Sequence, residues 1–132
     1  MNKFETKTIK ELNLKIGGLG EDIAKAYLEN KGYKIIERNY RTKYAEIDIV
    51  AKKEGVLVFV EVRTKTGKMF GIPEETINKR KKEKLKRNAI AYMTKKEWKG
   101  LGRIDAVCIV LKPDLLNKRH EVEYLNHYEN IC

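Results

Sequence analysis

Apolar residues recur at two different spacings along the chain, and the spacing predicts which segments are helices and which are strands. Ile16, Leu19 and Ile23 lie one helical turn apart and indicate an amphipathic helix that ends before Gly32. Alternating or continuous apolar runs between turn residues predict strands. The predicted elements are a helix over 16–30, strands over 33–41, 45–52 and 55–65, a helix over 74–98, and strands over 103–111 and 120–127.

This order predicts an α/β domain, in which one mixed sheet has helices packed against it. The strand over 103–111 is almost continuously apolar, as is typical of a buried strand, whereas the last strand is expected at a sheet edge. Residues 1–14 are polar and are interpreted as a loose N-terminal arm or as the start of the first helix. Residues 15–132 are interpreted as a single domain, since they contain no repeat and no low-complexity linker.

The net charge of +10, from 29 basic and 19 acidic residues, favours a polyanionic partner such as nucleic acid. The alternative is a lysine-rich surface without a special partner. The two cysteines, Cys108 in an apolar run and Cys132 at the end, form neither a disulfide framework nor a zinc site, which favours a reducing cytoplasm. The apolar runs are too short to span a membrane, and a secretory signal is absent, so a cytoplasmic protein without a membrane partner is expected.

The most informative segment is the predicted hairpin that joins the second and third strands. If Glu54-Gly55 forms a two-residue turn, Asp48 lies opposite Glu61 and Glu46 lies opposite Arg63. Two carboxylates at that separation repel each other unless a cation lies between them, and Mg²⁺ prefers carboxylate oxygens. The alternative is that both carboxylates face solvent at a sheet edge and are neutralised by Arg63 and nearby lysines.

The surroundings of Glu61 favour the metal. Glu61 follows the apolar run 56–60, and a carboxylate in such a strand is rarely tolerated without a partner. One or two metal ions at this position would suit phosphodiester hydrolysis, with a neighbouring cation stabilising charge on the phosphate. The hairpin therefore predicts a Mg²⁺- or Mn²⁺-dependent nuclease site.

Residues 79–87 contain seven basic residues in nine, and this run predicts the nucleic-acid contact. Lys81 lies four residues after Ile77 and four before Leu85, so it is expected on the inward helix face, paired with a site carboxylate or a phosphate. The alternative is that its stem carries the ammonium out to solvent. The candidate nucleic-acid-binding residues are Lys65, Lys79, Arg80, Lys81, Lys82 and Lys84.

Several other side chains have both a functional and a structural interpretation. Tyr40, Tyr44 and Phe70 could stack on splayed bases or pack in the fold. Asp105 is expected to pair with Arg103 or Lys81, and His120 and His127 are expected at the surface. Glu21 lies at the edge of the apolar helix stripe, where Gly17 and Ala24 would allow a close approach to the sheet. The alternative is a glutamate near the start of the helix that the helix dipole favours.

A series of short motifs follows in order along residues 16–128, and in this series the chain resembles the YraN-like family of bacterial proteins. That family is similar to the PD-(D/E)xK nuclease superfamily, close to archaeal Holliday-junction resolvases. The motifs are Gly17-x-x-Gly20-Glu21, Ala24, Tyr27-Leu28, Gly32-Tyr33, Arg38-Asn39, Glu46-Ile47-Asp48, Phe59-Val60-Glu61-Val62-Arg63, Phe70-Gly71, Lys81 and Arg103-Ile104-Asp105.

The resemblance implies a restriction-endonuclease-like core, in which a central mixed β-sheet is flanked by α-helices. It implies an acidic cluster of Glu21, Asp48 and Glu61, with the backbone carbonyl of Val62 as a further metal ligand. It also implies a structured DNA substrate, and a homodimer, because related resolvases act as dimers.

Two residues depart from the family pattern. Ala45 stands where a glycine usually precedes the Glu-Ile-Asp motif, and Arg63 occupies the position of the catalytic lysine. Arginine stays protonated and cannot act as a general base, although it can hold a phosphate. Lys65, two residues further along the same strand face, is a candidate substitute. A non-cutting nucleic-acid-binding module on a nuclease scaffold is therefore the alternative to an enzyme.

Overall fold

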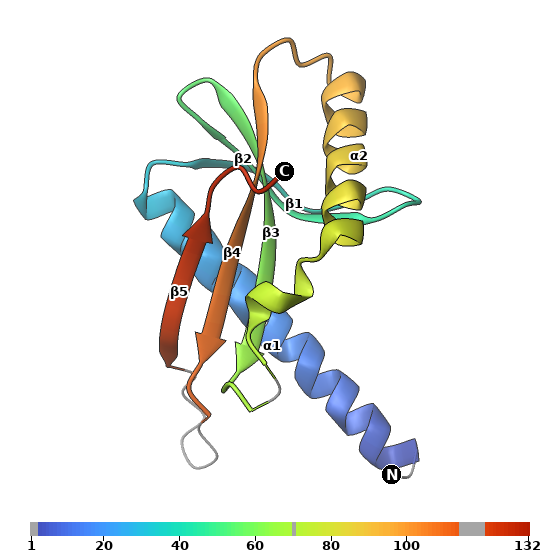
Figure 1. The fold of residues 1–132 in the computed structure, drawn as a ribbon, viewed down its shortest axis with the longest axis vertical. Coiled ribbons are helices and arrows are strands. Elements are labelled where there is room, and N and C mark those ends of the chain that lie inside the picture. The colour runs from blue at the N-terminus through green and yellow to red at the C-terminus, as the bar shows by residue number, and fades with distance from the viewer. Residues whose placement is uncertain (1–2, 70, 114–120) are drawn as a thin grey trace.

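The computed structural model describes residues 3–69, 71–113 and 121–132, and within them a five-stranded mixed sheet lies between two α-helices (Figure 1). The elements are α1 (Lys3–Asn30), β1 (Lys34–Arg41), β2 (Glu46–Lys53), β3 (Val56–Thr66), the 3₁₀ helix η1 (Pro73–Thr76), α2 (Lys79–Lys95), β4 (Gly102–Leu111) and β5 (Val122–Tyr128). This order confirms the predicted α/β class, and the arrangement is consistent with a restriction-endonuclease-like core.

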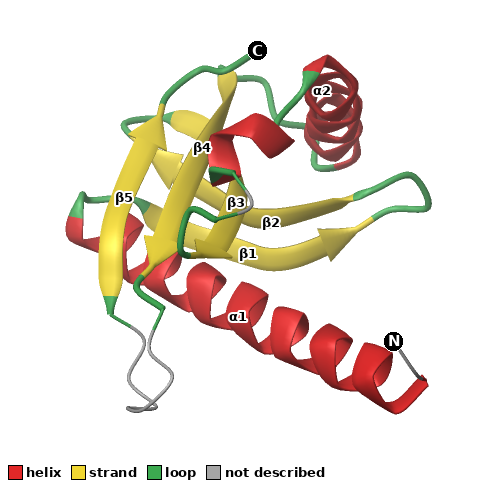
Figure 2. Ribbon diagram, turned by 60° about the horizontal axis from the view of Figure 1, so that its bottom comes forward, coloured by secondary structure: helices red, strands yellow, loops and turns green. Residues whose placement is uncertain are grey.

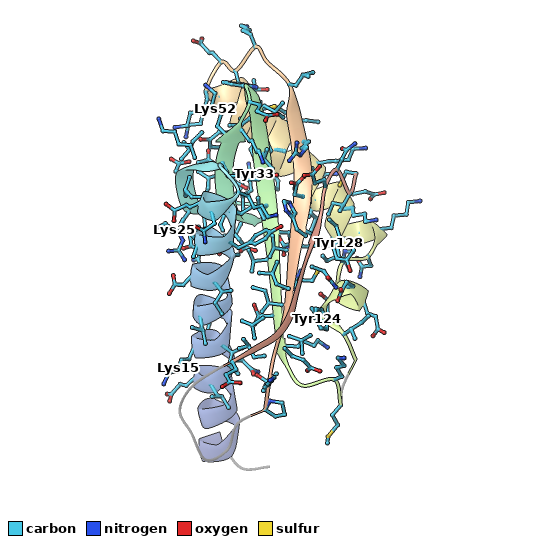
Figure 3. The ribbon with its side chains drawn as sticks, turned by 90° about the vertical axis from the view of Figure 1, so that its left-hand side faces the viewer. Lys15, Lys25, Tyr33, Lys52, Tyr124 and Tyr128 are labelled. Atoms are coloured by element: carbon cyan, nitrogen blue, oxygen red, sulfur yellow. The ribbon has the colours of Figure 1, made fainter. Side chains whose placement is uncertain are left out.

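The strands follow the order β1-β2-β3-β4-β5 across the sheet, which confirms that β5 is an edge strand. Neighbouring strands are antiparallel except β3 and β4, which are parallel. A parallel pair needs a crossover connection, and here η1 and α2 supply it. Helix α1 runs along one face of the sheet, whereas η1 and α2 lie on the opposite face (Figures 2 and 3).

Each sheet face has its own apolar core. On the α1 side, Ala24 and Leu28 are fully buried against a strand layer that includes Val60. On the α2 side, Leu85 packs with Phe59. Burying a side chain of this size contributes roughly 1.5–3 kcal/mol to the free energy of unfolding. The two cores therefore hold α1 and α2 against the opposite faces of the sheet.

Helix α1 begins at Lys3, well before the predicted start near Ile16. The periodic stripe that predicts the helix is present only where the helix packs on the sheet. Leu12 and Leu14 are 52% and 77% exposed, and residues 11–15 are all exposed, so this stretch of the helix presents no buried face that would produce a pattern. Hydrophobic periodicity therefore predicted the packed part of α1 and not its full length.

The predicted helix over 74–98 is shorter in the structure. Pro73 opens the separate turn η1, and α2 begins only after Asn78, whose side chain accepts a hydrogen bond from the Lys81 backbone N–H. Asn is among the favoured residues at this capping position. Helix α2 ends at Lys95, before the predicted end.

Gly20 allows α1 to lie close to β3. A Cβ at this position would collide with the side chain of Thr64, whereas a Cβ at Gly17 or Gly18 would meet nothing within 4 Å. The close approach predicted for Gly17 is therefore a property of Gly20, one helical turn further along. This contact positions Glu21, the next residue, at the edge of the sheet.

We predict that Gly20→Ala lowers the free energy of unfolding by about 1–2 kcal/mol, because the clash with Thr64 outweighs the better helix propensity of alanine. Gly18→Ala is the matched control and should raise the free energy of unfolding by up to about 1 kcal/mol, since it adds only helix propensity. Urea denaturation measures both. Equal effects of the two substitutions would show that Gly20 has no packing role.

Candidate metal centre and nucleic-acid interface

The β2–β3 hairpin has the predicted register. Glu54 and Gly55 both have positive φ angles, of 50° and 80°, as in the tight turns that suit antiparallel hairpins. The strand ladder pairs Lys53 with Val56 and continues to Ile49 and Val60. Beyond that pair a side chain replaces the backbone as the acceptor: Asp48 Oδ2 accepts a hydrogen bond of 2.8 Å from the Val62 backbone N–H.

Strand β2 does not keep the regular alternation of faces around Asp48. Ile47 packs in the α2-side core and Ile49 in the α1-side core, although residues two apart in a regular strand share a face. In the neighbouring strand, Asn39 has a positive φ of 52°. The irregularity places Asp48 among carboxylates on the α1 side, while Val50 faces α2.

Three carboxylates gather at this point. Single oxygens of Glu21, Glu46 and Asp48 all lie within 4.8 Å of one another, and each of the three side chains is half-buried. Glu21 comes from α1, and the other two come from the start of β2. The structure therefore brings Glu21 and Asp48 together as the resemblance implied, and it adds Glu46.

Glu46 does not lie against Arg63 as the hairpin register predicted. Its Oε2 accepts a hydrogen bond of 3.1 Å from Arg41 Nε. Its Oε1 accepts one of 2.8 Å from Asn39 Nδ2, and the same nitrogen donates to Glu21 Oε2 at 2.9 Å. Asn39 thus joins two carboxylates of the cluster. The only signal for it in the sequence was its place in the Arg38-Asn39 motif.

Glu61 is not one of these three carboxylates, and its side chain lies on the α2 side of the sheet, against Lys81. Its Oε1 lies 3.0 Å from Arg63 Nε and 3.4 Å from Lys81 Nζ, and its side chain is only 5% exposed. Its second oxygen, Oε2, is buried without a hydrogen-bond partner among the described residues. Lys81 thus faces inward as predicted, and its partner in the structure is the Glu61 carboxylate.

The half-buried Asp48 and the buried Glu61 both have raised pKa values. Burial and then the charge of Glu61 raise the pKa of Asp48 to about 7, although the hydrogen bond from Val62 works in the opposite direction. Burial also raises the pKa of Glu61, and the charges of Lys81 and Arg63 only partly offset it. Excess negative charge is therefore concentrated where β2 and β3 part.

These donors fit a hard divalent cation. Carboxylate oxygens are the ligands that Mg²⁺ and Mn²⁺ prefer, and a buried carboxylate oxygen without a partner is a free ligand atom. The raised pKa of Asp48 is what a bound cation would reverse, because a nearby positive charge favours the ionised form. The candidate ligands are the side chains of Asp48, Glu61 and Glu21 and the backbone carbonyl of Val62.

The remaining basic candidates have different positions. Lys79, Arg80 and Lys84 are exposed on α2, and Lys82 is half-buried. The ammonium of Lys65 lies beside Gly71, in the loop that precedes η1.

Of the three aromatic candidates, Tyr40 packs edge-on against Tyr92 with a centroid distance of 4.9 Å. Tyr44 is 61% exposed in the loop between β1 and β2. Phe70 lies outside the described residues.

Asp105 belongs to a separate buried network. Arg103 pairs with it as predicted, and His127 Nε2 lies 2.8 Å from its Oδ2. Burial alone would raise the pKa of Asp105, but hydrogen bonds from His127, Arg103 and the Asn130 backbone hold the pKa below its ordinary value. The surface position expected for His127 is wrong, since its side chain is only 8% exposed, and His120 lies outside the described residues.

Comparison with known proteins places the chain in a family. The sequence profile of the uncharacterised protein family UPF0102 matches residues 20–109. A UPF0102 protein of Clostridium botulinum (strain 657 / Type Ba4) is 40% identical over 117 residues, which cover 87% of this chain and 94% of that protein. A UPF0102 protein of Caldanaerobacter subterraneus subsp. tengcongensis is 38% identical over 124 residues, which cover 92% of this chain and 98% of that protein.

The fold defines the class first: an α/β protein with a restriction-endonuclease-like arrangement and a carboxylate cluster where β2 and β3 part. The chain belongs to the UPF0102 family, and this confirms the resemblance to YraN-like proteins. In the described part of the chain, every helix is too short or too polar to cross a membrane.

We predict that the free energy of unfolding falls as the pH rises from about 4 to about 7 in the absence of metal. In that range the native Asp48, with its pKa of about 7, holds a proton that the unfolded chain has lost. Asp48→Asn should remove this pH dependence. At pH 8 its free energy of unfolding should therefore exceed that of the unsubstituted protein by about 2–4 kcal/mol.

The measurement is urea denaturation across pH, with and without Mn²⁺. At pH 8, Mn²⁺ should stabilise the unsubstituted protein and leave Asp48→Asn unchanged, because binding to the native state alone adds to stability. Asp22→Asn, which removes one exposed carboxylate of α1, controls for the change in net charge. If the free energy of unfolding depended on pH in the same way in all three proteins, Asp48 would not have a raised pKa in the native state.

Proposed function

We propose that this protein is a nucleic-acid-binding protein with a Mg²⁺- or Mn²⁺-dependent phosphodiesterase site, acting on structured DNA. The observation that carries the proposal is the carboxylate cluster of Glu21, Glu46 and Asp48, together with the buried Glu61, whose charge helps to raise the pKa of Asp48 and whose carboxylate contacts Arg63 and Lys81. Carboxylates that would hold a metal ion, next to an arginine and a lysine that would contact phosphate oxygens, suit a metal-bound phosphodiester.

The acidic and basic residues of the site would have different roles. When bound, the metal ion would supply charge stabilisation for the phosphodiester and lower the pKa of an attacking water. Asp48 and Glu61 would hold the ion from the two sides of the sheet. Arg63 and Lys81, which contact Glu61 in the structure, would donate hydrogen bonds to phosphate oxygens. Asn39 would keep Glu21 and Glu46 in place.

The overall charge supports a polyanionic partner. The net charge is +10, and Lys79, Arg80 and Lys84 are exposed at the start of α2, close in the chain to Lys81 of the site. Both cysteines are free in the structure, which supports our inference of a reducing cytoplasm. A homodimer, which would offer two such sites to a branched DNA, is part of the same proposal.

We predict that the purified protein cuts branched or single-stranded DNA in the presence of Mg²⁺ or Mn²⁺. Asp48→Ala and Glu61→Ala should each lower the cleavage rate by about tenfold to a hundredfold or more, because each removes a candidate ligand. Glu83→Gln, which removes an exposed carboxylate of α2, is the control and should cut normally. Cleavage that survives in both site variants, or does not occur with any metal, would contradict the enzyme.

A second candidate function is a nucleic-acid-binding module that does not cut. The observation that favours it is Arg63 at the lysine position, where its guanidinium pairs with Glu61 at 3.0 Å. Arginine cannot accept a proton from water at any relevant pH. Together with Lys81 it can neutralise Glu61 without a metal ion.

The substitution Arg63→Lys separates the two functions. If the module is inactive because of Arg63, we expect metal-dependent cleavage to appear in Arg63→Lys, while the unsubstituted protein only binds DNA and does so more weakly as salt increases. If the protein is an enzyme that uses Arg63 to hold phosphate, Arg63→Lys should cut no faster than the unsubstituted protein. DNA binding by filter retention over a salt series, run beside the cleavage assay, gives both readouts.

A further inference from the structure

A cavity of about 280 Å³ lies beside the candidate site, under the start of α2. Its walls combine apolar side chains with one carboxylate, one lysine and one aromatic ring. The lining residues used below are Glu74, Ile77, Lys82, Ala106, Tyr128 and Ile131. The lining differs from the carboxylate cluster, because it has one carboxylate, Glu74, and one lysine, Lys82, among mainly apolar side chains.

The sheet register places this cavity next to Glu61. In the parallel ladder Glu61 is paired with Ala106, and in the next ladder Ala106 is paired with Tyr128. One row across β3, β4 and β5 therefore leads from the site carboxylate to the ring at the cavity wall. Tyr128 lies on the side of the sheet that carries η1 and α2 (Figure 3). Lys81, which contacts Glu61, is followed in the chain by Lys82 at the cavity.

The carboxylate of Glu74 is held in a fixed orientation. Tyr128 donates a hydrogen bond of 2.7 Å to Oε2, Tyr124 donates one of 3.1 Å to Oε1, and Asn126 donates a longer one of 3.4 Å. Partial burial works in the opposite direction, but these donors hold the pKa of Glu74 below its ordinary value. Glu74 is therefore a preorganised anion that accepts hydrogen bonds and repels phosphate.

A nucleic-acid strand offers the complementary groups. Its phosphates suit the cations Arg63, Lys81 and Lys82, whereas an unpaired base offers a flat apolar face and N–H donors on its edge. The Tyr128 ring provides a surface for stacking, and aromatic stacking tolerates any base. The carboxylate selects among bases: cytosine has an amino donor at N4, where thymine has the O4 acceptor.

We propose that the Glu74 cavity binds an unpaired cytosine-type base, with its amino group donating to Glu74, from a strand whose phosphates lie along Arg63, Lys81 and Lys82. This inference rests on the proposed nucleic-acid function and specifies its substrate: single-stranded or unstacked nucleotides at the site. It holds for both the cutting and the non-cutting candidate, because it concerns binding alone.

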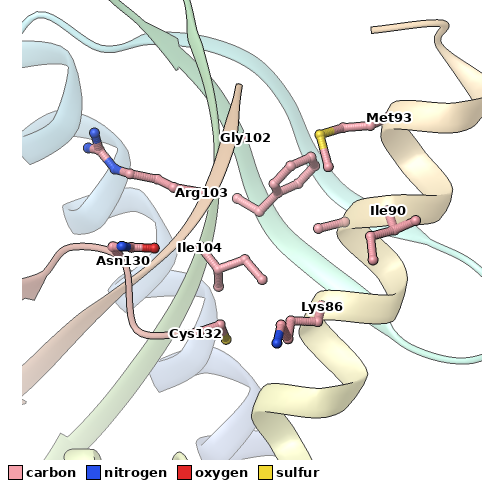
Figure 4. A pocket seen from close by; sticks show the side chains of 10 residues that line it. Lys86, Ile90, Met93, Gly102, Arg103, Ile104, Asn130 and Cys132 are labelled. Carbon is pink, nitrogen blue, oxygen red and sulfur yellow. The ribbon is translucent and has the colours of Figure 1, made fainter. Parts of the chain in front are cut away.

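A second cavity, between α2 and the sheet, differs in its lining. It measures about 160 Å³ and is formed by residues of α2, by the start of β4 and by the end of the chain, where Cys132 lies (Figure 4). Its lining includes Lys86 and Arg103 but no carboxylate, so it offers no selective acceptor for a base edge.

The test measures binding of oligo(dC) and oligo(dT) of equal length without metal, at one fixed salt concentration, by fluorescence anisotropy. The unsubstituted protein should bind oligo(dC) about fivefold to tenfold more tightly than oligo(dT). Glu74→Gln, which replaces the carboxylate with a neutral amide of the same shape, should bring this ratio close to one. Glu75→Gln removes the same charge from the neighbouring residue and should keep the ratio.

Two further variants keep the test decisive. Tyr128→Leu removes the stacking surface and should weaken binding of both oligonucleotides. It tests the base site independently if Glu74→Gln fails to fold. Lys81→Ala should weaken both equally and keep the ratio. A ratio of one in the unsubstituted protein, or an unchanged ratio in Glu74→Gln, overturns the base site while the nucleic-acid function stands. Absence of binding to any oligonucleotide at low salt overturns the proposed function itself, and with it this inference.

Discussion

The repulsion that the charge of Glu61 exerts on the half-buried Asp48 carboxylate, at the end of the β2–β3 ladder, is the interaction on which the rest of the site depends. Burial raises the pKa of both carboxylates; the charge of Glu61 raises the pKa of Asp48 further, and the charge of Glu21 acts in the same direction on Glu61. Folding places them there in spite of that penalty, and a raised pKa of this kind is common at functional sites. The neighbouring groups are arranged around it: Arg63 and Lys81 contact Glu61, and the Val62 backbone N–H donates to Asp48.

Three local features of the backbone bring the acidic residues together. The tight turn at Glu54 and Gly55 fixes the hairpin register, and the register determines which residues reach the end of the ladder. The positive φ of Asn39 accompanies the break in alternation that turns Asp48 toward α1. The absence of a side chain at Gly20 allows α1 to approach β3, so that Glu21 reaches the same place. Backbone geometry at three positions thus assembles acidic side chains from two layers of the fold.

The sequence predicted the elements and the hairpin register because both depend on local patterns. Glu54-Gly55 indicated the turn, and the turn specifies the pairing as far as Ile49 and Val60. It could not predict the irregular backbone beyond that pair, since the positive φ of Asn39 has no periodic signal. The prediction that Glu46 faces Arg63 failed for this reason: Arg41 and Asn39 of β1 bind Glu46 instead.

Contacts between distant segments were also beyond the sequence. His127 and Asp105 become partners only when β4 and β5 pair, so a lone histidine in a polar segment gave no indication of its burial. Glu74 acquires its three donors from β5 in the same way. The carboxylate cluster was predictable in part because Asp48 and Glu61 lie in one hairpin, whereas the cavity beside it is formed by four separate elements.

The most direct test of the central claim is the position of Mn²⁺ in a crystal of this protein soaked at a pH above 7, located by anomalous scattering. The account predicts a peak within coordination distance of carboxylate oxygens of both Asp48 and Glu61, with the Val62 carbonyl as a further ligand. Ordered carboxylates without a manganese peak between them, and with Glu61 still bound to Arg63 and Lys81 alone, would contradict it.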